Sequence, residues 1–312
     1  MSRAAEVVCV GESMVLVAPD GGQRLAAARS AALAVAGAES TVALYLTDLG
    51  HRTAWLSRVG ADPLGERVLD EIGGGGVDVG LVERDPAAPT GVYFKDPDPA
   101  ATTVHYYRSG SAASRLSAAD LDRLDLSATR LVHLSGITPA LSASAREMAS
   151  TLFARAGAAG VLRSFDVNHR PGLWPATEAA PVLLDLARAA DVVFVGLDEA
   201  AAVWGADRPD AVARLVGHGP AVVVKDADVG ATVFQAGERT FVAAGAVQVV
   251  EPVGAGDAFA AGYLSGLLRG AAPPVRLRWG HRVAGFALRS LGDHTDASSL
   301  RSAFDQELGG TA

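Results

Sequence analysis

The stretch DVVFVGLDEAAAVWGADRPDAVARLVGHGPAVVVK, residues 191–225, begins and ends with a short run that is apolar on both faces. Such runs, here 191–195 and 221–225, are typical of strands in a parallel sheet that is covered on both sides. Residues 198–204 and 209–217, which lie between them, have the periodicity of helices. A strand, a helical connection and a second strand predict a βαβ unit, so the stretch favours an α/β fold.

The same alternation continues toward the N-terminus. It predicts further strands at 6–10, 53–59, 130–135 and 161–167, and further helices at 39–49, 64–72, 142–157 and 178–190. After residue 255 the chain is mainly helical. The glycine run at 73–76 is expected to end a helix rather than to bind phosphate, since no helix follows it. The whole pattern predicts a doubly wound, mostly parallel sheet with helices on both faces.

Two segments, 14–28 and 88–108, break this alternation. They contain short extended runs, including GVYFK (91–95) and TVHYY (103–107), without helices between them. We expect these segments to form a small β-sheet that covers a site as a lid. Because no repeat or linker divides the chain, residues 1–312 are expected to form a single domain with this lid.

Composition limits the partners and the compartment. The net charge of −8 argues against nucleic acid or an anionic membrane as the main partner. No signal-peptide pattern is present, and no stretch approaches the roughly 18 apolar residues of a membrane-spanning helix. The single cysteine, Cys9, lies in the apolar run VVCV and is expected to be a buried thiol. These features predict a cytoplasmic protein.

Residues 251–266, EPVGAGDAFAAGYLSG, place an acid where a helix is predicted to begin. Apolar residues recur at helical spacing after Asp257. The first amides of a helix have no acceptor within it and carry the positive end of its dipole. Gly254 and Gly256, on either side of Ala255, would let anionic oxygens approach the backbone closely. The segment therefore predicts an anion cradle with a carboxylate beside it, and a simple helix cap is the alternative.

Other common sites are excluded by their spacing. A Walker A loop needs Gly-Lys-Ser/Thr, but neither Lys95 nor Lys225 follows a glycine. A dinucleotide fingerprint would need a small residue where Phe259 stands. The seven histidines have no zinc-ligand spacing, and His133, in an apolar strand, is expected to be structural.

Several motifs together identify a family. VGAGDAFAAG (253–262) is similar to the second signature of the ribokinase-like (PfkB) carbohydrate kinases, and residues 36–68 resemble their N-terminal sugar-binding signature. Four shorter motifs resemble 2-keto-3-deoxygluconate kinases in particular: VHYYRSGSAAS (104–114), HLSGITPALS (133–142), DVNHR (166–170) and LGDH (291–294). The resemblance covers nearly the whole chain.

The resemblance implies an ATP-dependent kinase that phosphorylates the terminal primary hydroxyl of a sugar acid, with Mg²⁺ bridging the phosphates. Asp257 would be the general base, and Gly254, Ala255 and Gly256 would form the anion hole with it. The implied substrate-binding residues are Gly37, Ala38, Thr41, Tyr93, Tyr106, Arg108 and Arg170. The implied nucleotide-binding residues are Asn168, Lys225, Gly230, Gly254, Gly256 and His281, and Glu199 is linked indirectly to the metal.

The arginines and tyrosines can also be interpreted from the residues alone. Arg108 and Arg170 each follow a predicted strand, and a pair of guanidinium groups is suited to a carboxylate. The alternative for each is a solvated surface arginine. Tyr93 and Tyr106 have ordinary strand aromatics as their alternative.

The chain departs from the family pattern on its nucleotide side. Gly196 replaces the Asn of an N-x-x-E motif, Ala227 replaces a glycine, Glu251 replaces an Asp and His281 replaces an Asn. On the sugar side, Thr41 also replaces an Asn. These changes put nucleotide affinity and metal handling in question.

Three matters stay open at this stage. The substrate could be another sugar, such as fructose, a related ketose or a nucleoside. The chain could also be a sugar-binding protein of the same fold that has lost turnover. A homodimer through the lid edges and the assistance of a monovalent cation are further open alternatives.

Overall fold

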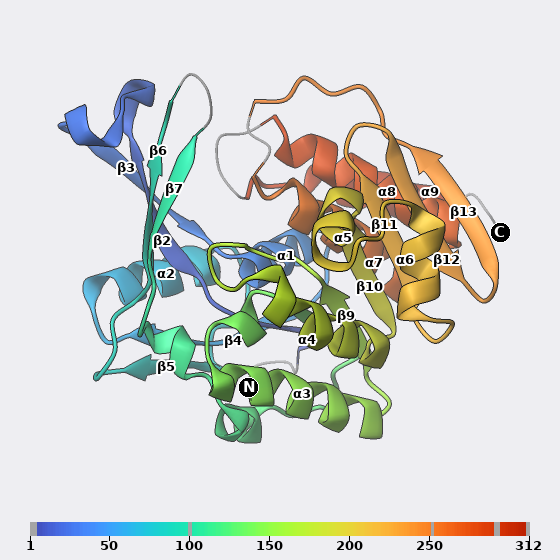
Figure 1. The fold of residues 1–312 in the computed structure, drawn as a ribbon, viewed down its shortest axis with the longest axis horizontal. Helices are drawn as coiled ribbons and strands as arrows, with labels where there is room; N and C mark the ends of the chain where they lie inside the picture. The colour runs from blue at the N-terminus through green and yellow to red at the C-terminus, as the bar shows by residue number, and fades with distance from the viewer. Residues whose placement is uncertain (1–4, 99–101, 251–252, 290–293, 310–312) are drawn as a thin grey trace.

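The computed structural model describes residues 5–98, 102–250, 253–289 and 294–309, and these form a nine-stranded and a four-stranded sheet (Figure 1). The large sheet has the order β13-β12-β11-β10-β9-β8-β1-β4-β5. Its strands are parallel from β11 to β5, and the hairpin of β12 and β13 adds an antiparallel edge. The strands are β1 Val7–Val10, β4 Thr53–Gly60, β5 Val82–Asp85, β8 Leu131–Ser135, β9 Leu162–Asp166, β10 Val192–Gly196, β11 Ala221–Asp226, β12 Gly230–Gln235 and β13 Glu238–Ala243.

Helices connect these strands in the predicted alternation. They are α1 Ala38–Asp48, α2 Pro63–Gly74, α3 Ala143–Ala158, α4 Ala176–Ala189, α5 Leu197–Trp204, α6 Pro209–Val216, α7 Ala255–Leu268, α8 Pro273–Ala287 and α9 Ser299–Gly309. Short 3₁₀ turns are η1 Asp20–Gly22, η2 Leu25–Ala27, η3 Ala112–Arg115, η4 Ala118–Arg123 and η5 Thr138–Ala140. The doubly wound, mostly parallel fold is confirmed, and every strand and helix predicted for the core is present. The glycine run ends α2, as expected.

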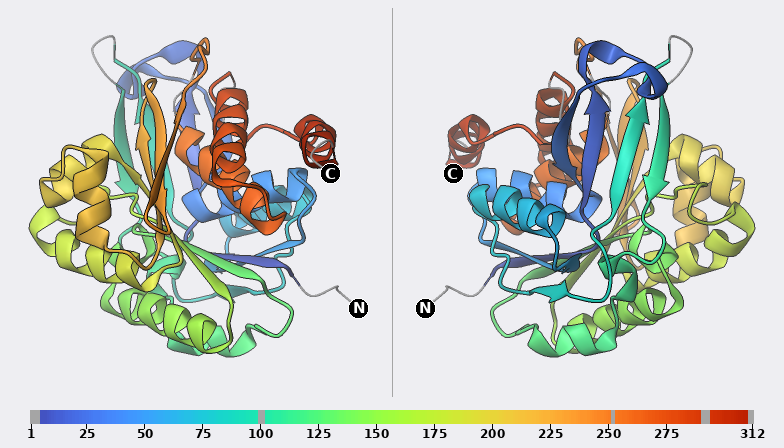
Figure 2. Two further views of the ribbon diagram at one scale, coloured as in Figure 1. Left: turned by 90° about the vertical axis from the view of Figure 1, so that its right-hand side faces the viewer. Right: turned by 90° about the vertical axis from the view of Figure 1, so that its left-hand side faces the viewer.

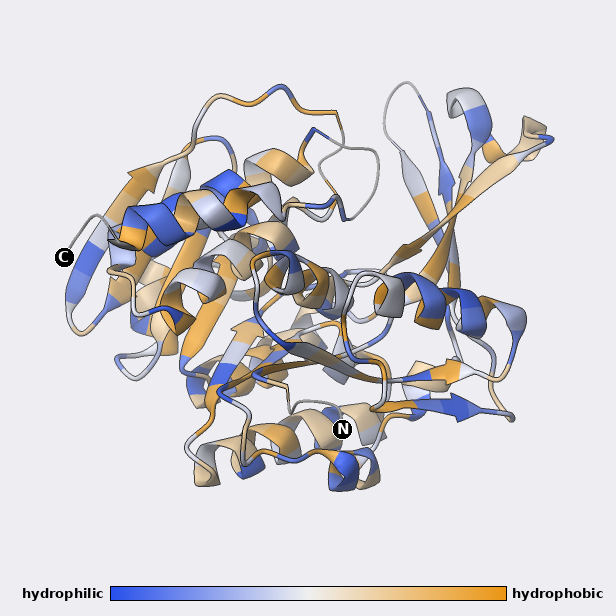
Figure 3. Cartoon of the chain, turned by 180° about the vertical axis from the view of Figure 1, so that it is seen from behind, coloured by the Kyte–Doolittle hydropathy of each residue, from blue (hydrophilic) through white to orange (hydrophobic). Residues whose placement is uncertain are grey.

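The two faces of the large sheet are covered by different helices (Figure 2). Along β1, Val8 and Val10 belong to the core beneath α3–α6, whereas Val7 and Cys9 belong to the core beneath α1, α2 and α7–α9. This alternation follows from the period of two in a strand. In Figure 3 the strands of the large sheet are mostly orange, and blue residues gather on the surrounding helices.

Helix α7 is unusual because it is buried along most of its length. It packs closely against α8, and Gly262 permits that approach: a Cβ there would lie 2.5 Å from the carbonyl oxygen of Trp279. A helix that is apolar on all sides is typical of a core position. The packing therefore fixes the direction in which the N-terminus of α7 points.

The small sheet has the order β3-β2-β6-β7 and lies to one side of the large sheet, next to α2 (Figure 1). Its strands are β2 Met14–Pro19, β3 Ala31–Ala36, β6 Val92–Asp96 and β7 Thr103–Tyr107. The predicted sheet is present, but it includes β3, which lies outside the predicted segment 14–28. The sequence AALAVA of β3 is rich in alanine and carries little strand signal.

Three smaller predictions can be compared with the structure. Cys9 is buried and is not in a disulfide. Burial lowers the pKa of His133 to about 4, and its Nδ1 lies 2.9 Å from Oγ of Ser164, which fits a structural role. Within the described residues, no helix is long and apolar enough to cross a membrane.

Candidate active site

A cavity of about 580 Å³ lies where the carboxyl ends of β1, β9, β10 and β11 meet the N-terminus of α7 and the small sheet. The carboxyl edge of a parallel sheet is the usual ligand position in doubly wound folds. Most of the predicted site residues line this cavity: Gly37, Ala38, Tyr93, Tyr106, Arg108, Asn168, Arg170, Glu199, Lys225, Gly254, Gly256 and Asp257. The structure thus brings together side chains from opposite ends of the chain.

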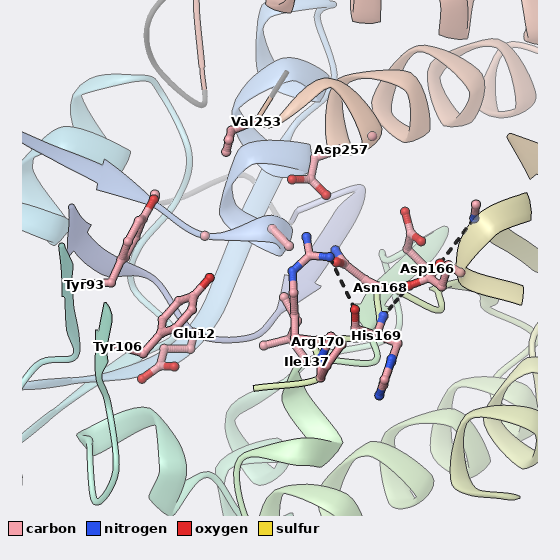
Figure 4. A pocket seen from close by; sticks show the side chains of 18 of the residues that line it. Glu12, Tyr93, Tyr106, Ile137, Asp166, Asn168, His169, Arg170, Val253 and Asp257 are labelled. Atoms are coloured by element: carbon pink, nitrogen blue, oxygen red, sulfur yellow. Dashed lines mark hydrogen bonds between the residues drawn. The ribbon is translucent and has the colours of Figure 1, made fainter. Parts of the chain in front are cut away.

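The N-terminus of α7 forms one wall. Gly254 is its N-cap in a left-handed conformation with φ of 79°, and no side chain caps the helix. A left-handed N-cap favours glycine. Ala255 belongs to the same first turn, although its side chain does not line the cavity. The carboxylate of Asp257 faces the cavity (Figure 4). The predicted helix start is confirmed, and its positive dipole end opens onto the space beside Asp257.

A cation lies beside this helix end. Nζ of Lys225 is 2.8 Å from Oδ2 of Asp166, and a Cβ on Gly256 would lie 3.4 Å from that Nζ. Burial opposes the charged form of Lys225, but the carboxylates of Asp166, Glu199 and Asp257 together outweigh it and raise the pKa of the ammonium group. The ammonium group of Lys225 therefore stays charged beside the first turn of α7. Asp166, at the end of β9, was not predicted as a site residue.

Glu199 completes this end of the cavity. Its carboxylate accepts hydrogen bonds from the backbone amides of His169 and Gly196. Burial raises the pKa of Glu199 to about 7, and the nearby Asp166 carboxylate adds to the rise. A carboxyl group that titrates near neutrality in a cavity is a mark of functional sites.

The departure at Gly196 has a structural counterpart. A Cβ on Gly196 would lie 2.8 Å from Oδ1 of Asp198, so Asp198 occupies part of the space that a side chain at 196 would need. Asp198 lines the cavity and was missed as a site residue. Among the described residues no cluster of three metal-ligating side chains is present. The carboxylates of Asp166, Asp198 and Glu199 suit a Mg²⁺ ion that is held mainly by phosphates and water.

Asn168 occupies a strained position between the two ends of the cavity. It is buried and has φ of 38°, a left-handed conformation that asparagine tolerates better than most residues. The next residue, His169, is fixed by a 3.1 Å hydrogen bond between Nε2 and the carbonyl of Trp174. The turn directs Asn168 and Arg170 into the cavity (Figure 4).

The opposite end of the cavity holds a second buried ion pair. Nη2 of Arg108 contacts the carboxylate of Glu12, and Oγ of Ser111 donates to Oε1 of Glu12 at 2.5 Å. The side chain of Arg108 is only 8% exposed, so the surface-arginine alternative is wrong for this residue. Arg170 is exposed but lines the cavity. Glu12 was missed, although it stands only two residues after the strand at 7–10.

Aromatic residues from the small sheet lie next to this pair. The ring centroids of Tyr93 and Tyr106 are 5.5 Å apart, and the guanidinium carbon of Arg108 is 5.7 Å from the centroid of Tyr106. Tyr93 is buried and Tyr106 is partly exposed. Figure 4 shows both tyrosines with Glu12 on the side of the cavity opposite to Asp166.

The start of α1 also lines the cavity, next to Glu12. Gly37 is packed so closely that a Cβ would lie 2.6 Å from the carbonyl oxygen of Glu12, which explains the glycine. Ala38 follows it at the cavity wall. Thr41 is buried one turn further along α1 and does not line the cavity.

Two predicted nucleotide residues lie elsewhere. His281 lines a second cavity of about 440 Å³, together with Val242, Val247 and Phe286. Burial lowers the pKa of His281, and its Nε2 is 3.1 Å from the carbonyl oxygen of Val242. Gly230 lines neither cavity and packs within the β12–β13 hairpin, where a Cβ would lie 2.4 Å from that same oxygen.

Two further positions differ from the family pattern, Ala227 and Glu251. Ala227 has φ of 38°, a conformation that favours the glycine usual there. Glu251 and the first three residues of the motif 291–294 lie outside the described residues.

Comparisons with known proteins cover nearly the whole chain. A family model described as pfkB family carbohydrate kinase matches residues 4–300. The 2-dehydro-3-deoxygluconokinase of Bacillus subtilis (strain 168) is 35% identical over 92% of this chain and 91% of its own. The crystal structure of a PfkB protein from Polaromonas sp. JS666 has a TM-score of 0.86 at 35% identity and covers 95% of this chain and 99% of its own. A fructokinase from Xylella fastidiosa with bound ATP has a TM-score of 0.84 at 25% identity and covers 97% of this chain and 98% of its own.

Proposed function

This chain belongs to the pfkB family of carbohydrate kinases, and we propose that its substrate is a sugar acid. The proposed acceptor is 2-keto-3-deoxygluconate, the same compound as 2-dehydro-3-deoxygluconate, and the proposed reaction transfers a phosphoryl group from ATP to its terminal primary hydroxyl. The observation that carries the proposal is the buried Arg108, which lines the same cavity as Asp257 and Arg170. Arg108 lies beside the small sheet, Arg170 lies next to Asn168, and Asp257 supplies the base (Figure 4).

Asp257 is proposed as the general base on the acceptor hydroxyl. Phosphoryl transfer has a loose transition state, so the hydroxyl proton leaves late and a weak base is sufficient. The first turn of α7, from Gly254 to Asp257, would hold the oxygens of the transferring group through its amides. Catalysis would then depend mainly on positioning and on stabilisation of charge.

The nucleotide is proposed to extend from this helix end toward the second cavity. Lys225 and Asn168 would lie beside its phosphates, and His281 would lie near its base. Mg²⁺ would offset negative charge on the phosphates, and Asp166, Asp198 and Glu199 are the residues available to bind its water molecules.

The acid group of the substrate is proposed to bind at the arginine end. A chain with a net charge of −8 repels carboxylates at long range, so acceptance of one needs local cations. Arg108 and Arg170 supply them, and Tyr93 and Tyr106 would contact the sugar. The small sheet would close over the substrate and exclude water, which would otherwise compete for the phosphoryl group.

Two of the altered nucleotide-side positions do not argue against turnover. Asp198 places a carboxylate beside Gly196, and Ala227 adopts the conformation of the missing glycine. Both departures are therefore accommodated locally. Closure of the lid, a homodimer through its edges, a cytoplasmic location and a role for a monovalent cation remain predictions.

Product analysis tests the proposal. The purified protein would be incubated with ATP, Mg²⁺ and either 2-keto-3-deoxygluconate or fructose, and the products would be identified by ³¹P NMR. A phosphomonoester on the primary hydroxyl of the acid is expected. Phosphorylation of fructose alone would support the alternative sugar kinase, and binding of a sugar without any product would support the sugar-binding protein.

A further inference from the structure

Glu12 lies where the small sheet joins the rest of the chain. It stands between β1 of the large sheet and β2 of the small sheet. The other connecting segments also reach it. Gly37 follows β3 and packs on its carbonyl oxygen, while a Cβ on Gly91, just before β6, would lie 2.9 Å from its Oε1. Ser111 and Arg108, which follow β7, bind its carboxylate.

This position makes Glu12 a fixed point of the junction. Its side chain is 1% exposed, and the backbone of its neighbour is held because Oγ of Ser13 donates to Oγ of Ser40 at 2.6 Å. Neither partner of the ion pair belongs to a regular strand or helix. The orientation of the Arg108 side chain therefore depends on its contact with Glu12 as well as on its position after β7.

The Arg108 guanidinium is only partly satisfied. Its Nη2 contacts Glu12, but its Nε is buried and has no hydrogen-bond partner among the described residues. Buried donors in folded proteins nearly always have an acceptor, so an orphaned one needs an explanation. Oε2 of Glu12 is also buried without a hydrogen-bond partner among the described residues, so the pair is held by its ion contact rather than by hydrogen bonds.

The charge of Arg108 is also already balanced. Because Glu12 neutralises it, a second carboxylate that binds the same guanidinium must approach an existing negative charge. At an effective dielectric constant of about 20, repulsion between two carboxylates that share a guanidinium corresponds to roughly a tenfold to hundredfold loss of affinity. Arg170, whose one hydrogen bond among the described residues is to the carbonyl of His169, brings a positive charge without such a partner.

We propose that Glu12 is a positioning residue that sets the affinity for an acidic substrate: it aims Arg108 into the cavity and weakens the attraction of that cation for a carboxylate. The inference rests on the proposed sugar-acid specificity. Two properties of the Glu12 side chain have different effects. Its shape orients Arg108, and its negative charge repels the carboxylate of the substrate.

Two substitutions distinguish these properties. In Glu12→Gln an amide oxygen can still accept from Arg108, while the charge is lost. In Glu12→Ala both are lost, and Arg108 is free to turn away. The affinity for the acid should therefore rise about tenfold or more in the first variant and fall about tenfold in the second. A residue that only stabilised the fold would not move the affinity in opposite directions.

The measurement is titration calorimetry with two ligands of the same skeleton. One is 2-keto-3-deoxygluconate, and the other is 3-deoxyfructose, which has CH₂OH in place of the carboxylate. The neutral ligand should change affinity by less than about threefold in Glu12→Gln, since it has no charge for Glu12 to repel. Glu39→Gln is the matched control, because Glu39 is a buried carboxylate that binds Ser135 and Thr138 and does not line the cavity.

The outcomes are separable. If Glu12→Gln binds the acid with unchanged or weaker affinity while the wild type binds it, the inference is overturned and the proposed function stands. If the wild type binds no sugar acid, the proposed function is wrong and the inference falls with it. Should Glu12→Ala fail to fold, Glu12→Asp takes its place: its shorter side chain keeps the charge but loses reach, so weaker acid binding is expected and tighter binding overturns the inference.

Discussion

The two ends of the cavity each contain a cation paired with a carboxylate, but different parts of the fold hold the pairs. Lys225 and Asp166 stand at the carboxyl ends of β11 and β9, on either side of β10 in the same sheet. Arg108 and Glu12 stand on segments that join two sheets. The first pair is fixed by strand register, whereas the second depends on how the small sheet meets the large one.

This difference separates two tasks. At the Lys225 end the charges and the α7 amides are fixed by the core, as stabilisation of a transferring phosphoryl group requires. At the Arg108 end the charges lie where the small sheet joins the large one, and we propose that this sheet closes over the bound substrate. We therefore expect substitutions at the two ends to affect different kinetic parameters.

The largest expected effect is at the phosphoryl end. Asp257→Asn should lower kcat by roughly 10²–10⁴, the usual range for a positioned general base, while sugar affinity changes little. Steady-state kinetics and sugar titration of the same variant would check this. Near-normal turnover would mean that Asp257 is not the general base, and the contrast between the two ends would lose its chemical basis.

The pH dependence of stability tests the same end without substrate. The pKa of Glu199 is raised to about 7, so the folded state favours its protonated form, and the stability that this form contributes is lost as the pH rises from about 4.5 to 7. Relative to Glu199→Gln, the wild type should therefore lose up to about 3 kcal/mol of unfolding free energy between pH 4.5 and 8.

Urea unfolding in the presence of EDTA at several pH values measures this difference. Glu178→Gln, at an exposed position on α4, is the control and should show no such trend. A constant difference between wild type and Glu199→Gln across this pH range would contradict the environment described for Glu199.

The next effect is at the acid end. Arg108→Ala should lower kcat/KM for 2-keto-3-deoxygluconate about tenfold to hundredfold, since a hydrogen bond to a charged group contributes about 1.5–3 kcal/mol. The value for 3-deoxyfructose should fall far less. Equal losses on both substrates would show that Arg108 shapes the site generally.

The smallest effect is expected for Arg170→Ala. Its side chain is exposed, unlike that of Arg108, so solvent and salt screen its charge and the loss for the acid should be less than about tenfold. The loss should shrink further at high ionic strength, which kinetics at 0.05 and 0.5 M KCl would measure. If Arg170→Ala lost more kcat/KM for the acid than Arg108→Ala, and if salt did not change that loss, Arg170 would be the more important of the two arginines and the account would be wrong on this point.

The core of this fold could be predicted from sequence because its strands are buried on both faces and its helices have regular apolar spacing. The start of α7 followed from Gly254 and the apolar residues after Asp257. Strands with weaker signals were missed: β3 is rich in alanine, β5 has four residues with the sequence VERD, and the β12–β13 hairpin turns at Ala236 and Gly237 without a strong turn motif.

The site was harder to predict where side chains from distant segments pair. Arg108 could be proposed from its position after a strand. Its partner Glu12 lies far away in the sequence, on the segment that connects β1 of the large sheet to β2 of the small sheet. Asp166 and Glu12 do share one signal, an acid at the carboxyl end of an apolar strand. The same position also holds Asp85 and Asp226, which do not line the cavity, so it would not have singled out Asp166 and Glu12.

The most direct test of a sugar-acid kinase is the selectivity of the wild type. An ATP-coupled assay would compare kcat/KM for 2-keto-3-deoxygluconate and for 3-deoxyfructose, which differ only at the group that Arg108 and Arg170 are proposed to bind. We predict a preference for the acid of about hundredfold or more, since two charged contacts contribute. Equal values for the two compounds, or a preference for the neutral one, would contradict the account.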